Sequence, residues 1–154
     1  MSGREEVREL QERLEAVEQQ KQALQTEVTA LRQEQSDIDE AIEGIETLET
    51  GSTVQVPLGG GAYLRAEVRD MDEITVDIGG DYSAERDRDG AIDSLENKRD
   101  TIDDRIAEIE EEIDELDEES EELAEQAQQA QQQMQQQLQQ QMGGGQGPPG
   151  RPDE

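Results

Sequence analysis

The chain has 154 residues, with 42 acidic and 13 basic side chains, no histidine and a net charge of −29. It has no Cys, Phe or Trp and only 30% of its residues are apolar, so one chain can hardly build a large core. The charge opposes binding to nucleic acid or an anionic membrane. Without Cys and His, the chain also lacks the usual thiolates, metal ligands and acid–base groups. No apolar run is long enough to span a membrane and no signal region opens the chain, so we expect a cytoplasmic protein.

The basic residues are unevenly chosen: there are 11 Arg but only two Lys, Lys21 and Lys98. Acid excess with scarce Lys indicates a halophilic protein, adapted to concentrated salt. The alternative is an ordinary acidic coiled coil, but coiled coils normally use Lys freely beside their seams.

Residues 4–49 predict a long helix. Apolar residues alternate at spacings of three and four over six heptads, if Lys21 and Gln35 fill the two gaps. The seam comprises Val7, Leu10, Leu14, Val17, Leu24, Val28, Leu31, Ile38, Ile42 and Ile45. Ser2 with Glu5 forms a capping-box pattern, and Gly51 is a plausible stop.

Residues 52–86 change to a period of two, which predicts strands with one apolar face. Gly59-Gly60-Gly61 and Gly79-Gly80-Asp81 each separate two such runs, so we expect two β-hairpins. The glycine triplet opens a strand and lacks the Lys of a phosphate-binding loop, so a nucleotide site is not expected.

Residues 88–142 return to the helical alternation, with Arg99 and Ser120 at two seam positions and 12 Gln among residues 126–142. Residues 143–154 are rich in Gly and Pro, which predicts a flexible tail. We therefore divide the chain into an N-terminal coiled-coil helix (1–51), two β-hairpins (52–86), a C-terminal coiled-coil helix (87–142) and a disordered tail (143–154).

The expected fold class is α+β: a long antiparallel two-helix coiled coil with two β-hairpins inserted between the helices. Matching Ile45 with Ile92 gives a register in which paired residue numbers sum to about 137, so that Leu10 meets Ala127.

We expect nothing else in the chain to cover the apolar face of the hairpins, because the two helices already pack against each other. The hairpins then contribute to an oligomeric β-barrel platform. The alternative is a β cap folded onto the base of its own coil. The expected interface residues are Val54, Val56, Leu58, Leu64, Val68, Ile74, Val76 and Ile78.

This organisation resembles the α-type subunit of archaeal prefoldin. The segments Val56–Val68 and Val76–Tyr82 carry the resemblance, and two hairpins rather than one favour the α type. The resemblance implies a hetero-hexamer of two α-type and four β-type subunits. It also implies ATP-independent capture of unfolded client proteins and their delivery to a group II chaperonin.

The two helix ends opposite the hairpins are the predicted client-binding tip. In the register above, the first helix ends opposite about residue 133, which leaves Met134, Leu138 and Met142 without a partner helix. Flexible Met side chains suit promiscuous apolar contacts. Val7, Leu10 and Leu14 lie close by on the first helix and complete the predicted tip. The alternative is a frayed helix end without a role.

Glu85–Glu96 mimics a calcium loop in the spacing of its oxygen ligands, but a strand precedes it and Ile92 and Leu95 belong to the seam. We interpret it as a strand-to-helix turn with capping acids. Paired acids elsewhere lie on solvated helix faces, so we expect no enzyme, no metal and no cofactor. The alternative to a chaperone is a structural coiled-coil spacer or adaptor with one fixed partner.

Overall fold

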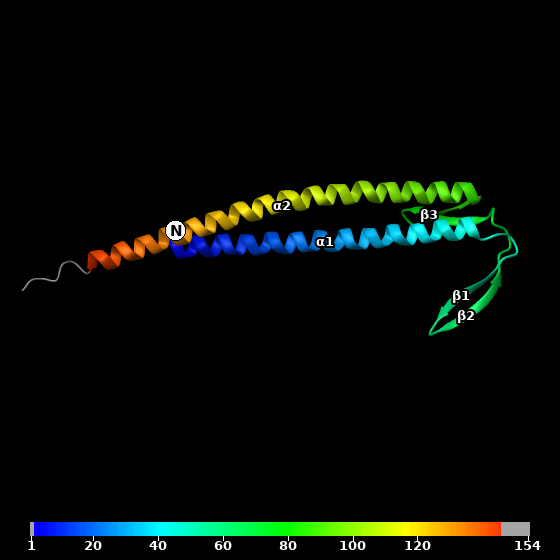
Figure 1. The fold of residues 1–154 in the computed structure, drawn as a ribbon, viewed down its shortest axis with the longest axis horizontal. Coiled ribbons are helices and arrows are strands. Elements are labelled where there is room, and N and C mark those ends of the chain that lie inside the picture. Colours follow the sequence, from blue (N-terminus) through cyan, green and yellow to red (C-terminus); the bar gives the residue numbers. More distant parts are fainter. Residues whose placement is uncertain (1, 146–154) are drawn as a thin grey trace, which may run out of the picture. The chain divides into compact units, whose positions relative to one another are not determined.

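The computed structural model describes residues 2–145 of the chain (Figure 1). In order, its elements are helix α1 (Gly3–Thr47), strands β1 (Thr53–Gly59), β2 (Ala62–Glu67), β3 (Ile74–Gly79) and β4 (Tyr82–Arg86), and helix α2 (Arg88–Gly145). The predicted fold is confirmed, because two long helices pack antiparallel with two β-hairpins between them. Helix α2 continues to Gly145, and the rest of the predicted tail, residues 146–154, lies outside the described residues.

The chain divides into two compact units. The terminal unit comprises Met1–Thr26 and Ile109–Glu154, and the hairpin unit comprises Glu27–Glu108. Each unit contains a stretch of both helices, and each has its own apolar cluster along the seam where α1 meets α2.

The seam of the terminal unit is built from the predicted heptad positions. Its buried members are Val7, Leu10 and Val17 from α1 with Leu123 and Ala130 from α2, and Leu14, Leu116 and Ala127 pack against them. The predicted pairs Leu10 with Ala127 and Val7 with Ala130 fall within this one cluster. The first turn of α1 is capped as expected, since the Glu5 backbone N–H donates to Ser2 Oγ at 3.2 Å.

The hairpin unit has a β-branched seam. Ile38 and Ile42 of α1 and Ile102 and Ile106 of α2 are buried together, with Val28, Leu31, Ile92 and Leu95 packed against them. Arg88, the first residue of α2, closes the base of this seam. Its guanidinium donates to the carbonyl oxygens of Ile45 (2.7 Å), Glu46 (3.2 Å) and Leu48 (2.8 Å). Ile45 and Glu46 lie in the last turn of α1 and Leu48 directly follows it, so Arg88 caps the carbonyl end of this helix.

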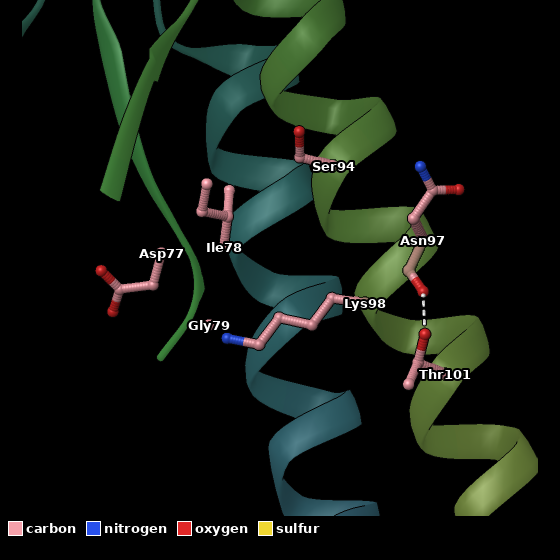
Figure 2. Close-up of a pocket in the computed structure, with 7 residues that line it drawn as sticks. All are labelled: Asp77, Ile78, Gly79, Ser94, Asn97, Lys98 and Thr101. Atoms are coloured by element: carbon pink, nitrogen blue, oxygen red, sulfur yellow. Dashed lines mark hydrogen bonds between the residues drawn. The ribbon is translucent and has the colours of Figure 1, made fainter. Parts of the chain in front are cut away.

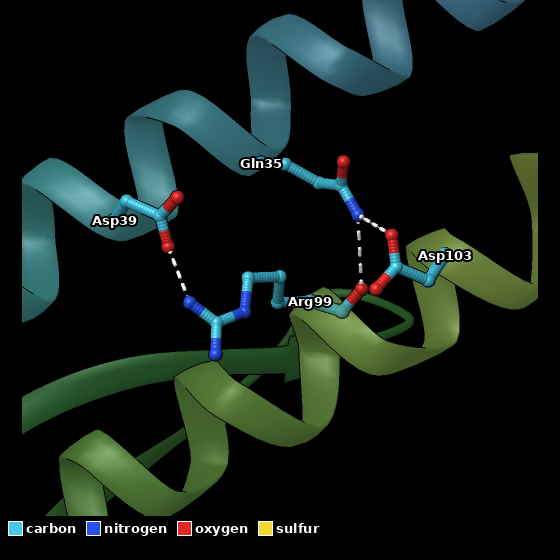
Figure 3. Close-up of polar contacts among 4 residues, drawn as sticks. All are labelled: Gln35, Asp39, Arg99 and Asp103. Atoms are coloured by element: carbon cyan, nitrogen blue, oxygen red, sulfur yellow. Dashed lines mark hydrogen bonds and ion pairs between the residues drawn. The ribbon is translucent and has the colours of Figure 1, made fainter.

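Polar side chains replace apolar ones at the two gaps in the α1 seam, and Figure 3 shows the gap at Gln35. Gln35 donates from its amide to the Arg99 carbonyl at 3.3 Å and to Asp103 Oδ1 at 2.5 Å. Arg99 in turn donates to Asp39 Oδ1 at 2.6 Å. In the terminal unit, Lys21 forms an ion pair with Asp117 of α2. Each gap is thus a hydrogen-bonded polar layer across the helix pair.

The hairpins form two separate two-stranded antiparallel sheets. In the first, Val56 pairs with Leu64 and Val54 with Ala66, which places these side chains on one face. In the second, Val76 pairs with Ala84. Both turns need a backbone that L side chains rarely adopt, because Gly59, Gly60 and Gly61, like Gly79 and Gly80, have positive φ.

Candidate binding surfaces at the end of α2 and on the hairpins

The predicted tip residues of α1 lie inside the seam rather than on the surface. Val7 and Leu10 are buried, and Leu14 is half-buried and packs against the same cluster. These three side chains therefore stabilise the helix pair of the terminal unit, and their packing leaves little of Val7 or Leu10 for an outside partner.

Met134 has a partner in the chain, which corrects the expectation that it would have none. It is half-buried, and a Cβ placed on Gly3 would lie 3.5 Å from Met134 Cγ, so the first residue of α1 lies directly beside it. Gly3 and Met134 sum to 137, as the predicted register requires. Helix α1 begins one residue earlier than the heptads suggested, and Gly3 has no side chain to hold Met134 away.

Beyond Met134, two apolar side chains of α2 are exposed. Leu138 is 45% exposed and Met142 is 65% exposed. They continue the α2 seam at spacings of four residues, past the point where α1 begins. A helical stripe that continues a buried seam without its partner helix is a surface able to bind an apolar segment.

The first hairpin presents its large apolar side chains to solvent. Leu58 is 65% exposed and Leu64 is 54% exposed, and Val56 is exposed as well. Val54 and Val68, nearer the base of the hairpin, are half-buried. An isolated hairpin with this face uncovered is marginal in water, so burial of the face would stabilise it.

The second hairpin differs, because its own chain covers much of its apolar face. It lies against the helix pair (Figure 1), Val76 is only 6% exposed, and Ile74 is half-buried. We expected the whole face of both hairpins to be uncovered, and this is wrong for Val76. The idea of a β cap on its own coil therefore holds for the second hairpin but not for the first.

The end of the second hairpin remains open. Ile78 is exposed, and it lines a pocket of about 400 Å³ with Asp77, Gly79, Ser94, Asn97, Lys98 and Thr101. Figure 2 shows the Lys98 side chain extending from α2 toward Gly79 of the hairpin. The sequence analysis did not include Tyr63 and Tyr82 among the interface residues, and both are exposed at the starts of β2 and β4. Their being the only two aromatic residues of the chain was the available signal.

The segment that mimics a calcium loop caps a helix instead. The Asp87 carboxylate accepts a hydrogen bond from the Gly90 backbone N–H at 2.7 Å, at the first turn of α2. Among residues 2–145, no group of acidic side chains is arranged to hold a metal ion. No helix in this part of the chain is long and apolar enough to cross a membrane.

Comparison with known protein families agrees with the sequence resemblance. A family model described as "Prefoldin subunit" matches residues 17–140. The chain is 69% identical over 80 residues to prefoldin subunit alpha of Halorubrum lacusprofundi and 61% identical over 80 residues to that of Haloarcula marismortui. These matches cover 52% of this chain and 53% and 52% of the relatives, so the chain spans about half the length of the curated relatives it matches.

Two solved structures show the same fold. The cryo-EM structure of filamentous PFD from Methanocaldococcus jannaschii has a TM-score of 0.52 at 27% identity, covering 80% of this chain and 98% of that chain. The crystal structure of the prefoldin beta subunit from Thermococcus strain KS-1 has a TM-score of 0.53 at 22% identity, covering 80% and 90%. The second likeness supports the fold alone.

Proposed function

The chain belongs to the prefoldin family, and from this we propose that it is the α-type subunit of an ATP-independent holdase chaperone that captures unfolded proteins at the end of α2. The family is one of non-enzymatic chaperone subunits, in agreement with the absence of catalytic motifs from the sequence. The curated relatives are themselves named prefoldin subunit alpha.

The observation that carries the proposal is the exposed pair Leu138 and Met142 beyond the start of α1. Together they offer a narrow apolar stripe with a flexible thioether, which can adapt to many sequences. A single stripe of this size binds weakly. Several such tips in one assembly would raise the overall avidity through effective concentration.

Assembly is proposed to use the first hairpin. Its exposed face of Val56, Leu58 and Leu64 would pair with β-type subunits in a hetero-hexamer of two α-type and four β-type chains, in the cytoplasm. The hexamer would hand its clients to a group II chaperonin. The support is the uncovered apolar face, which the chain does not bury by itself.

The capture proposal is tested by light scattering during the refolding of several unrelated denatured proteins. The wild-type chain with a β-type partner should suppress their aggregation, and the Leu138→Ser/Met142→Ser double variant should lose most of this effect. The matched control is Gln137→Ser/Gln141→Ser, which changes the same helix end but no large apolar side chain. Equal suppression by the double variant and the control would refute this site, and no suppression by wild type would favour a spacer or adaptor.

Two separate variants, each with one charge added to a different face of the first hairpin, test the assembly proposal. Leu64→Asp should abolish the complex with a β-type subunit, because an unpaired charge would be buried in the interface. Gln55→Asp, on the opposite face, should leave the complex intact. Val76→Asp is unsuitable here, since Val76 is buried within its own chain and its loss would disturb folding first.

A further inference from the structure

We propose that the end of α2 is built to receive acidic client segments, because it is free of charge in a chain that elsewhere repels acids. The proposal rests on the capture function above and names the class of client. We define the neutral segment as residues 126–142, the part of α2 that includes Met134, Leu138 and Met142.

The neutral segment differs sharply in charge from the helix that leads into it. Residues 110–125 contain eleven acidic side chains and no basic one, whereas residues 126–142 contain 12 Gln and no charged side chain. The change occurs between Glu125 and Gln126, in the middle of one continuous helix. Neither the fold nor the seam requires it, since Leu123, Ala127 and Ala130 pack alike on either side of the boundary.

The exposed apolar pair lies far enough from the acidic stretch to escape its field. Leu138 is thirteen residues from Glu125, which is about 20 Å along a helix. The Debye length is about 8 Å at physiological ionic strength and about 3 Å in molar salt. An acidic segment bound at Leu138 is therefore at least two Debye lengths from those carboxylates.

The facing end of α1 restores only a small part of the repulsion. Gly3 lies beside Met134, and the turns that follow carry Arg4 and Arg8 against four acids, Glu5, Glu6, Glu9 and Glu12, with Arg8 paired to Glu12. The facing turns of α1 thus hold two bases against four acids, whereas residues 110–125 hold eleven acids and no base. A segment with Asp or Glu beside its apolar residues therefore meets much less electrostatic repulsion here than along residues 110–125.

Glutamine also offers an acidic segment favourable contacts. Each side-chain amide has two N–H donors for carboxylates or backbone carbonyls and an acceptor for backbone N–H groups. A basic segment would instead be attracted to residues 110–125, so the neutral segment gives its main advantage to acidic ones. The occupant we infer is an unfolded stretch with apolar residues flanked by Asp and Glu.

The test measures binding of two fluorescent peptides to the complex of this chain with a β-type subunit, by anisotropy in about 0.5 M KCl, where screening is partial. The peptides share one apolar core and differ only in flanks of Glu or of Gln. The variant is Gln135→Glu/Gln139→Glu/Gln141→Glu. The matched control adds three charges to exposed positions of α1 as Gln11→Glu/Gln19→Glu/Gln22→Glu, and circular dichroism verifies that all proteins remain helical.

Wild type should bind both peptides with similar affinity. In the variant, affinity for the Glu-flanked peptide should fall about fivefold and recover in molar KCl, because like charges then face each other at short range. The Gln-flanked peptide should be unaffected, as should both peptides with the control. An unchanged affinity for the Glu-flanked peptide in the variant, or an equal loss in the control, would overturn the inference.

A different result would refute the proposed capture of clients at the end of α2. If Leu138→Ser/Met142→Ser leaves the binding of both peptides intact, capture does not occur at this end of α2 at all. If that double variant loses binding of the Gln-flanked peptide while wild type binds only that peptide, capture stands and the inferred acceptance of acidic segments is wrong.

Discussion

Lowering the salt concentration should open the terminal unit before the hairpin unit. Residues 110–125 carry eleven acidic side chains without a basic one on a single helix. Like charges three or four residues apart are neighbours on a helix and destabilise it by about 0.2–0.5 kcal/mol per pair. This stretch contains about fourteen such pairs, so their repulsion amounts to about 3–7 kcal/mol when unscreened.

That magnitude matters, because an ordinary domain is stable by only about 5–15 kcal/mol. The hairpin unit responds differently, since cross-helix ion pairs hold its seam. Arg99 binds Asp39 at 2.6 Å and Arg105 binds Glu27 at 3.1 Å, and such exposed pairs strengthen slightly as salt is removed. Asp103 of the same unit is bound to Gln35, and the terminal unit has a cross-helix pair of its own in Lys21 with Asp117.

The assay is hydrogen exchange of the complex in about 1 M and about 0.1 M KCl, where the Debye length is about 3 and 10 Å. In low salt, amides of the terminal unit should exchange faster by a factor of ten or more, as expected for a loss of at least about 1.4 kcal/mol. Glu111→Gln/Glu115→Gln/Glu118→Gln removes more than half of the like-charged pairs and should restore protection. The control, Glu40→Gln/Glu73→Gln/Asp100→Asn, removes three charges from the hairpin unit.

Equal protection of both units in low salt would refute this reasoning, together with the halophilic interpretation of the composition. So would equal rescue by the two triple variants, because the effect would then follow net charge rather than the crowded stretch of α2.

Three further predictions follow from single contacts. Arg88→Ala should lower the free energy of unfolding by about 2 kcal/mol, because three carbonyls at and just after the end of α1 lose a charged donor, and thermal melting should show no such loss for Arg86→Ala. The pKa of Lys21 is raised above its ordinary value by its hydrogen bond to Asp117. The contribution of this pair to stability should therefore be complete below about pH 10 and be lost as pH rises through the pKa of Lys21 in the folded state. Melting curves at alkaline pH should show this loss in wild type and not in Lys21→Met. Replacing Gln35 and Arg99 together by Leu should raise the melting temperature but make the pairing register of the two helices less specific. Cysteines introduced one heptad out of register into this Cys-free chain should then form a disulfide that they do not form in the wild-type background.

The sequence predicted the helices, the hairpins and the register because each depends on a local period. Heptads determine which side chains face the seam, and the close approach of Gly3 to Met134 agrees with the predicted sum of 137. The glycine runs marked both turns, since positive φ is rarely available to other residues.

What the sequence did not predict depends on contacts between distant segments. Alternation made both hairpins look alike, and only the tertiary packing distinguishes Val76, which is buried, from Leu64, which is exposed. The Arg88 cap joins residues about forty apart and has no local pattern. Gln35 and Lys21 were recognised as gaps in the seam, but their hydrogen-bonding partners on α2 could not be read from spacing alone.

The most direct test of the proposal that this chain is an α-type prefoldin subunit is native mass spectrometry of the chain alone and of the chain mixed with a β-type prefoldin subunit. The samples are prepared in molar salt and then exchanged into a volatile buffer. We predict that the chain alone is self-associated or poorly folded, because the face of its first hairpin is uncovered, and that mixing yields one species with two copies of this chain and four of its partner. A well-folded monomer that keeps the same mass when the partner is added would contradict the account.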